Sequence, residues 1–531
     1  MLRFVRQLTN CKMLSTSASS QTSRLVPCIT LTPVEHNITS LLKEYCTHYN
    51  ATNAMKEPLE PRITGGWVRD KLLGQTSHDL DIAVNVMSGQ EFAEGLLEYL
   101  KTHPREGGDQ VVGGSGIHTI EKNPEKSKHL ETATTKLYGL DIDFVNLRNE
   151  EYTEESRIPQ IKFGTPEEDA MRRDATLNAL FYNIQREQVE DFTRLGLRDL
   201  EQGILRTPLE PRKTFLDDPL RVLRLIRFAS RFGFDLDSNT FQAMKGQEVK
   251  KALIDKISRE RVGVEMGKTL ESDAVKGLRL LSETGLMSVV FGFGNLDKDI
   301  RQFNDIAFID KHNNQVDNDT WNAIEKITPF NFGNKLTPVV SEVLSNPYEK
   351  RLLWISVVLR PWAGLKVVFN KKQKQMWASE AIVREGLKFS KNDADMVTKI
   401  LSTSGDFQAV VNKLPEFKRS EIGFVLRNYD AEYKLALVFN LFDEVIKNEN
   451  DKMDGILSKY EQMWDLIHAE RLEDVYKLKP LVDGKKVCKV LDRKPGPWMA
   501  PLTNQILVWQ LDNPDKSEEE CLQFIKGVLE K

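Results

Sequence analysis

Several features typical of secreted and membrane proteins are missing from this chain of 531 residues. Its five cysteines are widely separated and form no CxxC pair, which argues against a disulfide framework or a zinc site and favours reduced thiols inside a cell. No apolar run reaches the roughly 18 residues that a membrane-spanning helix needs, so we expect no membrane span. The net charge of -4 gives no overall basic character. A local basic face can still bind nucleic acid.

Acidic side chains are also absent from the first 34 residues. This segment combines serines, threonines and apolar residues with a few basic residues: Arg3, Arg6, Lys12 and Arg24. Such a composition is typical of a mitochondrial transit peptide, and a disordered tail is the alternative. A second methionine, Met13, lies inside the segment. Translation from Met13 would discard most of the basic helix, which predicts a second product in the cytoplasm and nucleus.

The spacing of apolar residues changes along the rest of the chain. Residues 35–60 have helical spacing, whereas short alternating runs predict strands at 79–84, 140–148 and 180–185. The stretch near 105–135 is rich in glycine and charge and is typical of a loop or a mobile hairpin. The predicted architecture is an α/β head followed by helices, divided into a targeting segment (1–34), a head (35–193), a helical neck (194–275), a helical body (276–470) and a basic tail (471–531).

The segment ITGGWVRDKLLGQTSHDLDIAV, residues 63–84, joins a Gly-Gly turn to two aspartates at alternating positions. Strand side chains alternate in direction, so Asp79 and Asp81 face one side while the apolar residues face the core. Two close carboxylates repel each other unless a cation lies between them, and Mg²⁺ prefers oxygen ligands that it shares with phosphates. A third carboxylate is expected on the 140–148 strand, from Asp143 or, as the alternative, Asp141.

The glycine turn and a later arginine pair predict a binding site for a nucleoside triphosphate. Gly65 and Gly66 are expected to end a strand and begin a helix, whose N-terminus favours phosphate, and Arg69 would add a charged fork. The segment MRRDATLNALFYN (171–183) supplies Arg172, Arg173, Asp174 and Asn178. On a helix, Asp174 and Asn178 share a face and can hold ribose and triphosphate oxygens. An amphipathic surface helix is the alternative.

The segment FLDDPLRVLRLIRF (215–228) predicts a capped helix, with Asp218 at its N-cap and Pro219 at the first helical position. Cytosine and adenine each present an amino donor beside a ring-nitrogen acceptor. A carboxylate from Asp218 and a guanidinium from Arg221 suit both bases, and they leave unpaired groups against uracil and guanine. A capped helix with an arginine stripe is the simpler alternative.

The order strand, Gly-Gly, helix and DxD strand resembles the nucleotidyltransferase superfamily with a polymerase-β-like palm. The GG-W-V-R-D spacing is similar to class II tRNA nucleotidyltransferases, the CCA-adding enzymes, and to their bacterial poly(A) polymerase relatives. Residues 172–179 and 217–221 resemble the family motifs RRDxxxNA and E-D-x-x-R, with Asp217 in place of the usual Glu. Further resemblance lies around Asp191 and Gly196, around Arg261 and Glu265, and in the tail segments KPGPW and WQLDNP, which are similar to eukaryotic members.

The resemblance implies template-independent addition of C, C and A to the 3′ end of tRNA from CTP and ATP. It further implies two-metal nucleotidyl transfer, with Mg²⁺ held by Asp79 and Asp81, and a protein template formed by Asp218 and Arg221. The alternatives are a poly(A) polymerase of the same fold and a catalytically inactive RNA-binding relative. No obligate protein partner is evident. RNA contacts are expected from basic residues of the tail, although a solvated basic segment explains them equally well: Lys477, Lys479, Lys485, Lys486, Lys489, Arg493 and Lys494.

Overall fold

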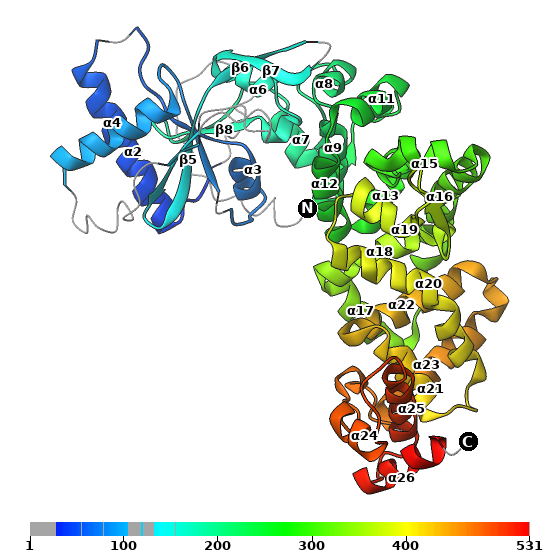
Figure 1. Ribbon diagram of the computed structural model, residues 1–531. Coiled ribbons are helices and arrows are strands. Elements are labelled where there is room, and N and C mark those ends of the chain that lie inside the picture. The colour runs from blue at the N-terminus through cyan, green and yellow to red at the C-terminus, as the bar shows by residue number, and fades with distance from the viewer. Residues whose placement is uncertain are drawn as a thin grey trace. The chain divides into compact units, whose positions relative to one another are not determined.

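The computed structural model forms two compact units, which divide after Ile257. The residues it describes are 28–54, 56–77, 79–104, 118–120, 132–153 and 156–529. The first unit contains a mixed sheet with helices, and the second unit is almost entirely helical (Figure 1). The predicted class, an α/β head followed by helices, is therefore confirmed. The finer division at residues 193, 275 and 470 stays a prediction.

A seven-stranded sheet with the order β3-β4-β5-β2-β1-β8-β9 forms the centre of the first unit. Strands β2 and β5 run parallel, and every other neighbouring pair is antiparallel. The strands expected at 79–84, 140–148 and 180–185 are all present, with shorter bounds. The strands are β1 (Arg62–Thr64), β2 (Leu80–Val84), β3 (His118–Ile120), β4 (Thr132–Leu137), β5 (Leu140–Asn146), β8 (Leu180–Asn183) and β9 (Gln188–Asp191).

Helices α2 (Pro33–Thr52) and α4 (Gly89–Thr102) pack against each other, and α4 packs on β4 and β5 (Figure 1). Helix α2 is also tied to α3 (Gly66–Leu72), which follows the glycine turn. The Glu35 carboxylate accepts hydrogen bonds from Trp67 Nε1 at 3.0 Å and from Lys71 Nζ at 2.6 Å. The N-terminal helix therefore fixes the helix that borders the site.

The stretch near 105–135, expected to be a loop or a mobile hairpin, contributes strands to the sheet. Strand β3 lies within it and β4 begins near its end; the two strands pair antiparallel, and β4 pairs along most of β5, so the sheet is extended by two strands. Residues 105–117 and 121–131 lie outside the described residues. A separate hairpin follows the sheet, formed by β6 (Arg148–Thr153) and β7 (Ser156–Phe163).

The expectation that one helix carries both Asp174 and Asn178 is wrong. Helix α6 (Pro166–Met171) ends at the start of this segment, and only a 3₁₀ turn, η2 (Thr176–Asn178), precedes β8. The backbone leaves the helical pattern because the Thr176 N–H donates to the Arg206 carbonyl at 2.9 Å. A tertiary hydrogen bond thus replaces a helical one at this position.

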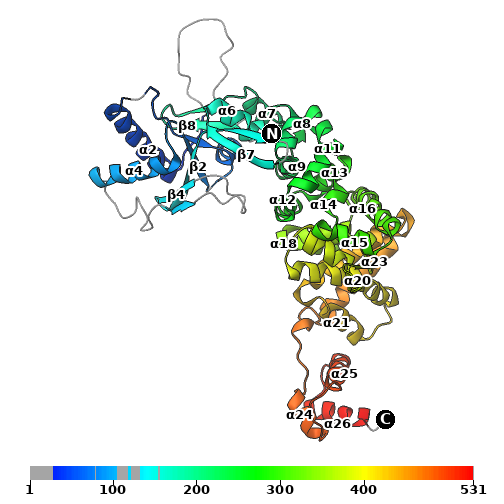
Figure 2. The same cartoon turned by 45° about the horizontal axis from the view of Figure 1, so that its top comes forward.

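Short helices complete the first unit, and among them α9 packs against α8 and β10 (Figure 2). Helix α9 has the apolar face that the sequence predicts, with Leu220, Leu223 and Phe228 buried. The remaining elements are α7 (Gly196–Gln202), β10 (Ile204–Leu205), α8 (Pro211–Asp217), α9 (Leu220–Phe232), β11 (Asp235–Leu236), α10 (Ser238–Met244) and α11 (Gln247–Lys256).

The second unit is built around α22 (Tyr433–Lys447), a largely buried helix that contacts α16, α17, α18, α20 and α23. Arg261 and Glu265 lie on its first helix, α12. The other elements are α12 (Arg259–Glu271), α13 (Ala274–Glu283), α14 (Met287–Val290), α15 (Asp297–Phe303), α16 (Ile306–Ile327), α17 (Gly333–Ser345), α18 (Pro347–Val358), β12 (Lys366–Val368), β13 (Gln375–Trp377), α19 (Ala378–Ala381), α20 (Lys391–Lys413), α21 (Arg419–Arg427), α23 (Met453–Ala469), α24 (Gly484–Val490), α25 (Met499–Asp512) and α26 (Glu518–Leu529).

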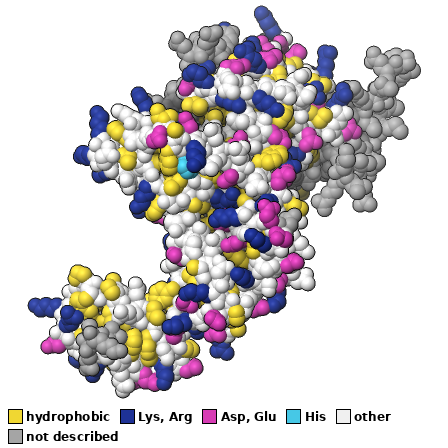
Figure 3. All heavy atoms as spheres, turned by 90° about the vertical axis from the view of Figure 1, so that its right-hand side faces the viewer, with side chains coloured by type: hydrophobic (Ala, Val, Ile, Leu, Met, Phe, Trp, Pro, Cys, Tyr) yellow, Lys and Arg dark blue, Asp and Glu magenta, His cyan; other side chains and the backbone are white. Residues whose placement is uncertain are grey.

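Acidic and basic side chains are interspersed on the face shown in Figure 3, as expected for a chain of small net charge. Among the described helices, none combines the length and the apolar character that a membrane crossing requires.

Candidate active site

The glycine turn between β1 and α3 has the conformation that the sequence predicts. Gly65 has φ 75° and ψ -138°, a backbone conformation that side chains with a Cβ rarely adopt. A Cβ placed on Gly65 would lie 3.5 Å from Arg173 Nη1 and 3.8 Å from Asp81 Oδ2. The turn therefore lies beside one cationic and one anionic side chain, and its backbone comes close to both.

The predicted carboxylates converge at this turn. Strands β2 and β5 pair in parallel with Asp81 opposite Asp143, and Asp79 precedes β2 directly. Burial raises the pKa of Asp81, and the charges of Asp143 and Asp79 raise it further against the opposing charge of Arg173. Three carboxylates and one guanidinium thus influence one another electrostatically beside the two central strands β2 and β5.

The structure distinguishes the two candidates for the third carboxylate. Asp143 is half-buried and accepts a 2.6 Å hydrogen bond from Thr134 Oγ1 on β4. The Asp141 side chain is 75% exposed and forms an ion pair with Lys136 at 3.4 Å. Asp143 is thus oriented beside Asp81, whereas Asp141 lies at the surface.

The donor set fits a hard divalent cation that shares its ligands with a substrate. Within the described residues, no group of three or more His, Cys, Asp or Glu side chains forms a preformed metal cage. Mg²⁺ commonly takes only one or two carboxylates from the protein and completes its coordination with phosphates and water. Asp79 and Asp81 supply carboxylates of that kind next to a turn suited to phosphate, so these residues fit the ion.

Two arginines after α6 are held by one buried carboxylate. Asp169, which is 1% exposed, accepts from Arg172 Nε at 2.9 Å and from Arg173 Nη2 at 2.7 Å. Although burial opposes ionisation, Arg173 and Arg172 lower the pKa of Asp169. Arg173 also donates to the Thr64 hydroxyl, at the end of β1. The guanidinium of Arg173 is therefore fixed beside the glycine turn.

Asp174 and Asn178 lie in contact, although no helix joins them. Asn178 Nδ2 donates to Asp174 Oδ1 at 2.9 Å, and Arg224 Nε on α9 donates to Asp174 Oδ2 at 2.6 Å. Burial opposes ionisation of Asp174, yet Arg224 and Asn178 bring its pKa well below the ordinary value. This carboxylate links the segment after α6 to α9.

Arg69 contacts protein groups on all its sides. Its Nη1 donates to Asn178 Oδ1 at 2.5 Å, its Nε donates to Asp70 at 2.7 Å, and its guanidinium lies 4.7 Å from the Phe232 ring centroid. Burial lowers the pKa of Arg69. In this structure Arg69 therefore orients Asn178, while its predicted contact with phosphate remains a prediction.

The candidate base-reading residues lie at the start of α9. The assigned helix begins at Leu220, one residue later than expected, but Asp218 Oδ1 still accepts from the Leu220 N–H at 3.2 Å, as an N-cap would. Arg221 is largely buried, with only 8% of its surface exposed, so it does not belong to a solvated arginine stripe on this helix. Its Nη2 donates to the Arg172 carbonyl at 2.7 Å. Arg221 is thus placed beside the arginine pair, while Asp218 lies at the start of the helix.

Comparison with known proteins identifies the family to which this arrangement belongs. Residues 61–206 match the poly A polymerase head domain, and residues 233–294 match the probable RNA and SrmB-binding site of polymerase A. The mitochondrial CCA tRNA nucleotidyltransferase of Candida glabrata is 45% identical over 525 residues, which cover 95% of this chain and 97% of that protein. The chain belongs to the CCA tRNA nucleotidyltransferase family. The Saccharomyces cerevisiae mitochondrial enzyme is also 45% identical, over 99% of this chain and 98% of its own.

Solved structures of CCA-adding enzymes share this fold. The Thermotoga maritima enzyme complexed with tRNA has a TM-score of 0.57 and 19% identity, covering 94% of this chain and 96% of that chain. The Bacillus stearothermophilus enzyme in complex with CTP has a TM-score of 0.56 and 19% identity, covering 94% of this chain and 98% of that chain. At this identity the likeness concerns the fold. Together with the relatives, it confirms the family that the sequence motifs indicated.

In this member of the CCA tRNA nucleotidyltransferase family, the basic residues of the tail differ in their surroundings. Lys477 pairs with Asp474 at 2.7 Å and Lys486 with Glu518 at 2.6 Å, while the Arg493 guanidinium lies 5.4 Å from the Trp498 ring centroid. The others are exposed and form no ion pair with a described acidic residue: Lys479, Lys485, Lys489 and Lys494. Their surface location is compatible with RNA contacts but does not test them.

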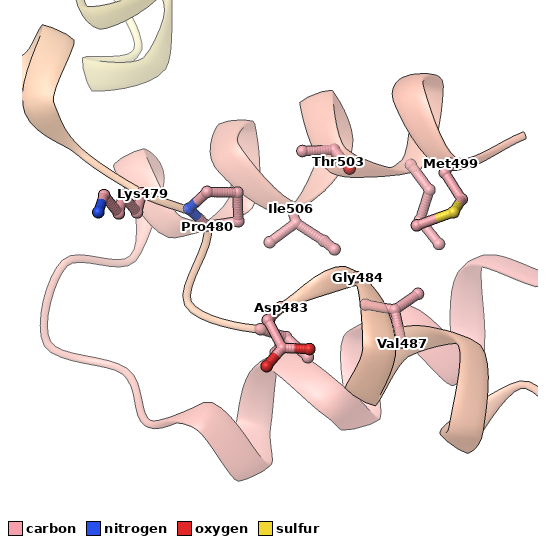
Figure 4. Close-up of a pocket in the computed structure, with 10 residues that line it drawn as sticks. Lys479, Pro480, Asp483, Gly484, Val487, Met499, Thr503 and Ile506 are labelled. Atoms are coloured by element: carbon pink, nitrogen blue, oxygen red, sulfur yellow. The ribbon is translucent and has the colours of Figure 1, made fainter. Parts of the chain in front are cut away.

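A small hydrophobic cluster supports the tail's basic surface. Val482, Val487, Leu502, Ile506, Cys521 and Ile525 are all buried in it. Beside this cluster, α24 and α25 border a hollow of about 350 Å³, which Val487 and Ile506 line from opposite sides (Figure 4). The lysines are thus carried on a packed helical element.

Sequence reasoning missed three residues that orient the site: Thr134, Glu150 and Asp169. Asp169 could have been found, because it precedes Arg172 and Arg173 by three and four residues, the spacing of neighbours on a helix. Glu150 accepts from Arg172 Nη1 at 2.8 Å, and Thr134 binds Asp143. No local spacing signals either of these contacts, because each joins separate elements.

Proposed function

We propose that this chain adds C, C and A in turn to the 3′ end of tRNA, with CTP and ATP as substrates and without a nucleic-acid template. The observation that carries the proposal is the register of β2 and β5, which sets Asp81 beside Asp143 at the Gly65 turn. The activity named for the relatives supports the reaction. Solved CCA-adding enzymes in complex with tRNA, CTP and ATP support the substrates.

Asp79 and Asp81 would hold Mg²⁺, with Asp143 as the third carboxylate of a two-metal site. Bound there, Mg²⁺ ions would activate the tRNA 3′-hydroxyl and neutralise charge on the triphosphate and the leaving pyrophosphate. The hydroxyl attacks the α-phosphorus, the bond to the β-phosphate oxygen breaks, and pyrophosphate departs. The residues of this chain contribute position and charge, so the reaction needs no nucleophilic side chain.

Gly65, Gly66 and Arg173 would bind the triphosphate, the glycines through backbone N–H groups at the start of α3. Arg172 and Arg69 would contribute to this positive region, while Asp174 and Asn178 would accept and donate hydrogen bonds at the ribose. The fixed position of Arg173 between Asp169 and Thr64 supports this arrangement. An arginine held in this way loses little conformational freedom when phosphate binds.

Asp218 and Arg221 would select the base. The carboxylate accepts from the exocyclic amino group of cytosine or adenine, and the guanidinium donates to the neighbouring ring nitrogen. Uracil and guanine present an acceptor and a donor in the opposite order, which leaves groups unpaired and lowers their binding. The position of Asp218 and Arg221 at the start of α9, with Arg221 next to the Arg172 carbonyl, supports a shared role.

In a direct test, a protein of residues 34–531 is incubated with a tRNA transcript lacking CCA, Mg²⁺ and each nucleotide alone or combined. We expect growth by three residues that requires CTP first and then ATP. A long ladder with ATP alone would instead establish a poly(A) polymerase. Absence of extension would favour an inactive RNA-binding relative. Asp79→Ala and Asp81→Ala should abolish addition while tRNA binding, measured by fluorescence titration, is retained.

Two relatives are named as mitochondrial enzymes, which supports import of this chain into mitochondria. The segment 1–34 would direct it there; its residues 1–27 lie outside the described residues. A product that begins at Met13 would remain in the cytoplasm and nucleus. Immunoblots of fractionated cells should show two N-termini, and a single N-terminus in every fraction would contradict the alternative start.

A further inference from the structure

Glu150 lies at the centre of an arginine cluster beside the candidate base-reading helix. It belongs to β6, in the hairpin outside the main sheet, and its side chain is only 5% exposed. Its Oε1 lies 2.9 Å from Arg148 Nε and accepts from Arg172 Nη1 at 2.8 Å. Its Oε2 lies 4.0 Å from Arg221 Nη2. One buried carboxylate thus faces three guanidinium groups.

The two oxygens of Glu150 act on Arg221 by two routes. Oε2 attracts the Arg221 guanidinium directly. Oε1 holds the side chain of Arg172, whose backbone carbonyl accepts from Arg221 Nη2 at 2.7 Å. A second carbonyl, that of Thr214, accepts from Arg221 Nη1 at 3.4 Å. Two backbone carbonyl groups and the Glu150 carboxylate therefore act on the orientation of the Arg221 guanidinium.

Glu150 supplies negative charge that offsets the repulsion among the arginines of this cluster. Burial lowers the pKa of Arg148 to about 10, and the neighbouring Arg172 lowers it as well, whereas Glu150 opposes this shift. Arg172 and Arg173 are paired with Asp169 on their other side. Without the Glu150 carboxylate, Arg148, Arg172 and Arg221 would repel one another in a partly buried space.

We propose that Glu150 is a positioning residue for base selection, which fixes the guanidinium of Arg221 so that it can discriminate cytosine and adenine from uracil and guanine. This inference rests on the base-selecting role proposed above for Arg221. A guanidinium discriminates only when its N–H groups point at the ring nitrogen of the bound base, since hydrogen bonds weaken steeply with misalignment. A residue that sets this plane controls selectivity without touching the nucleotide.

The variant Glu150→Gln tests the proposal with little change of shape. Its amide oxygen can still accept from Arg172, but its NH₂ group would face Arg221 in place of a carboxylate oxygen. We expect the ratio of kcat/KM for CTP to that for UTP to fall about tenfold, chiefly through a higher KM for CTP. Loss of folded protein alone would lower both values equally and leave the ratio unchanged.

Glu190→Gln is the matched control. Glu190 is also a buried glutamate in the first unit, 11% exposed and paired with Arg62 at 2.7 Å, and it lies on β9 away from the arginine cluster. We expect the nucleotide selectivity of the Glu190→Gln variant to equal that of the wild type. Purified full-length variants would be assayed with a tRNA transcript lacking CCA, Mg²⁺ and single nucleotides.

Arg221→Ala, assayed in parallel, separates this proposal from the one on which it rests. If Arg221→Ala relaxes selectivity and Glu150→Gln does so too, with no further effect in the double variant, the positioning role is supported. If Arg221→Ala relaxes selectivity while Glu150→Gln matches the wild type, Glu150 has no such role. If Arg221→Ala itself keeps full selectivity, Arg221 does not read the base and both proposals are overturned.

Discussion

Replacing Gly65 with alanine should damage the site through the backbone alone. A Cβ at this position would meet no atom closer than 3.5 Å, so the added methyl group has room. The φ of 75° and ψ of -138° are the obstacle, because a residue held in such a sparsely populated region is strained by about 1–3 kcal/mol. That strain corresponds to a factor of about 5 to 150 in an equilibrium constant.

The turn can relieve this strain only by rotating the peptides that border Gly65. Rotation would turn their N–H groups away from the phosphates, so kcat/KM for CTP should fall by a similar factor in Gly65→Ala. Gly66→Ala is the matched control, since Gly66 lies in α3 without a positive φ and its Cβ would be 3.1 Å from the end of the Arg69 side chain. We expect a loss of less than about fivefold there.

Single-turnover addition to a tRNA transcript, with CTP varied, measures both effects. Hydrogen exchange of the amides in β1 and α3 reports whether the turn has kept its local stability. Equal kcat/KM values and equal exchange protection in Gly65→Ala and Gly66→Ala would refute the reasoning, because the two variants differ in backbone conformation and not in added volume.

Three further predictions follow from the ion pairs and hydrogen bonds of the site and the tail. Asp143→Asn should slow single-turnover addition at least about a hundredfold, whereas the exposed Asp141→Asn should stay within about twofold; equal losses would contradict the assignment of Asp143. Because the folded-state pKa of Asp174 is depressed, its ion pair stabilises the protein above the unfolded pKa of about 4, and this stability is lost as the pH falls towards the folded pKa. The thermal unfolding midpoint of the wild type should therefore decrease as the pH falls below about 4. Asp174→Asn should make the midpoint depend less on pH, and parallel curves of midpoint against pH for the two proteins would contradict the prediction. Changing Lys485, Lys489 and Lys494 to alanine should reduce the salt dependence of tRNA binding by about two to three units of slope, while changing the ion-paired Lys477 and Lys486 should have less effect; an unchanged slope in fluorescence titrations would exclude the tail contact.

The sequence by itself determined the local elements of the site, because they depend on neighbouring residues. Alternation of apolar residues with Asp79 and Asp81 was enough to predict β2 and the side of the strand on which the Asp81 carboxylate lies. The glycine pair predicted the turn between β1 and α3, and the order of the motifs indicated the family. The helix expected to carry Asp174 and Asn178 was predicted wrongly, since the bond between Thr176 and the Arg206 carbonyl depends on a distant segment.

Only the tertiary structure decided which side chains meet. Asp141 and Asp143 share a strand face, and the register of β5 against β2 and β4 sets Asp143 beside Asp81 and Thr134. The burial of Arg69 and the contact of Glu150 with Arg221 likewise join separate elements. Such contacts depend on how sheet, hairpin and helix pack. The spacing of residues within any one segment carries no information about that packing.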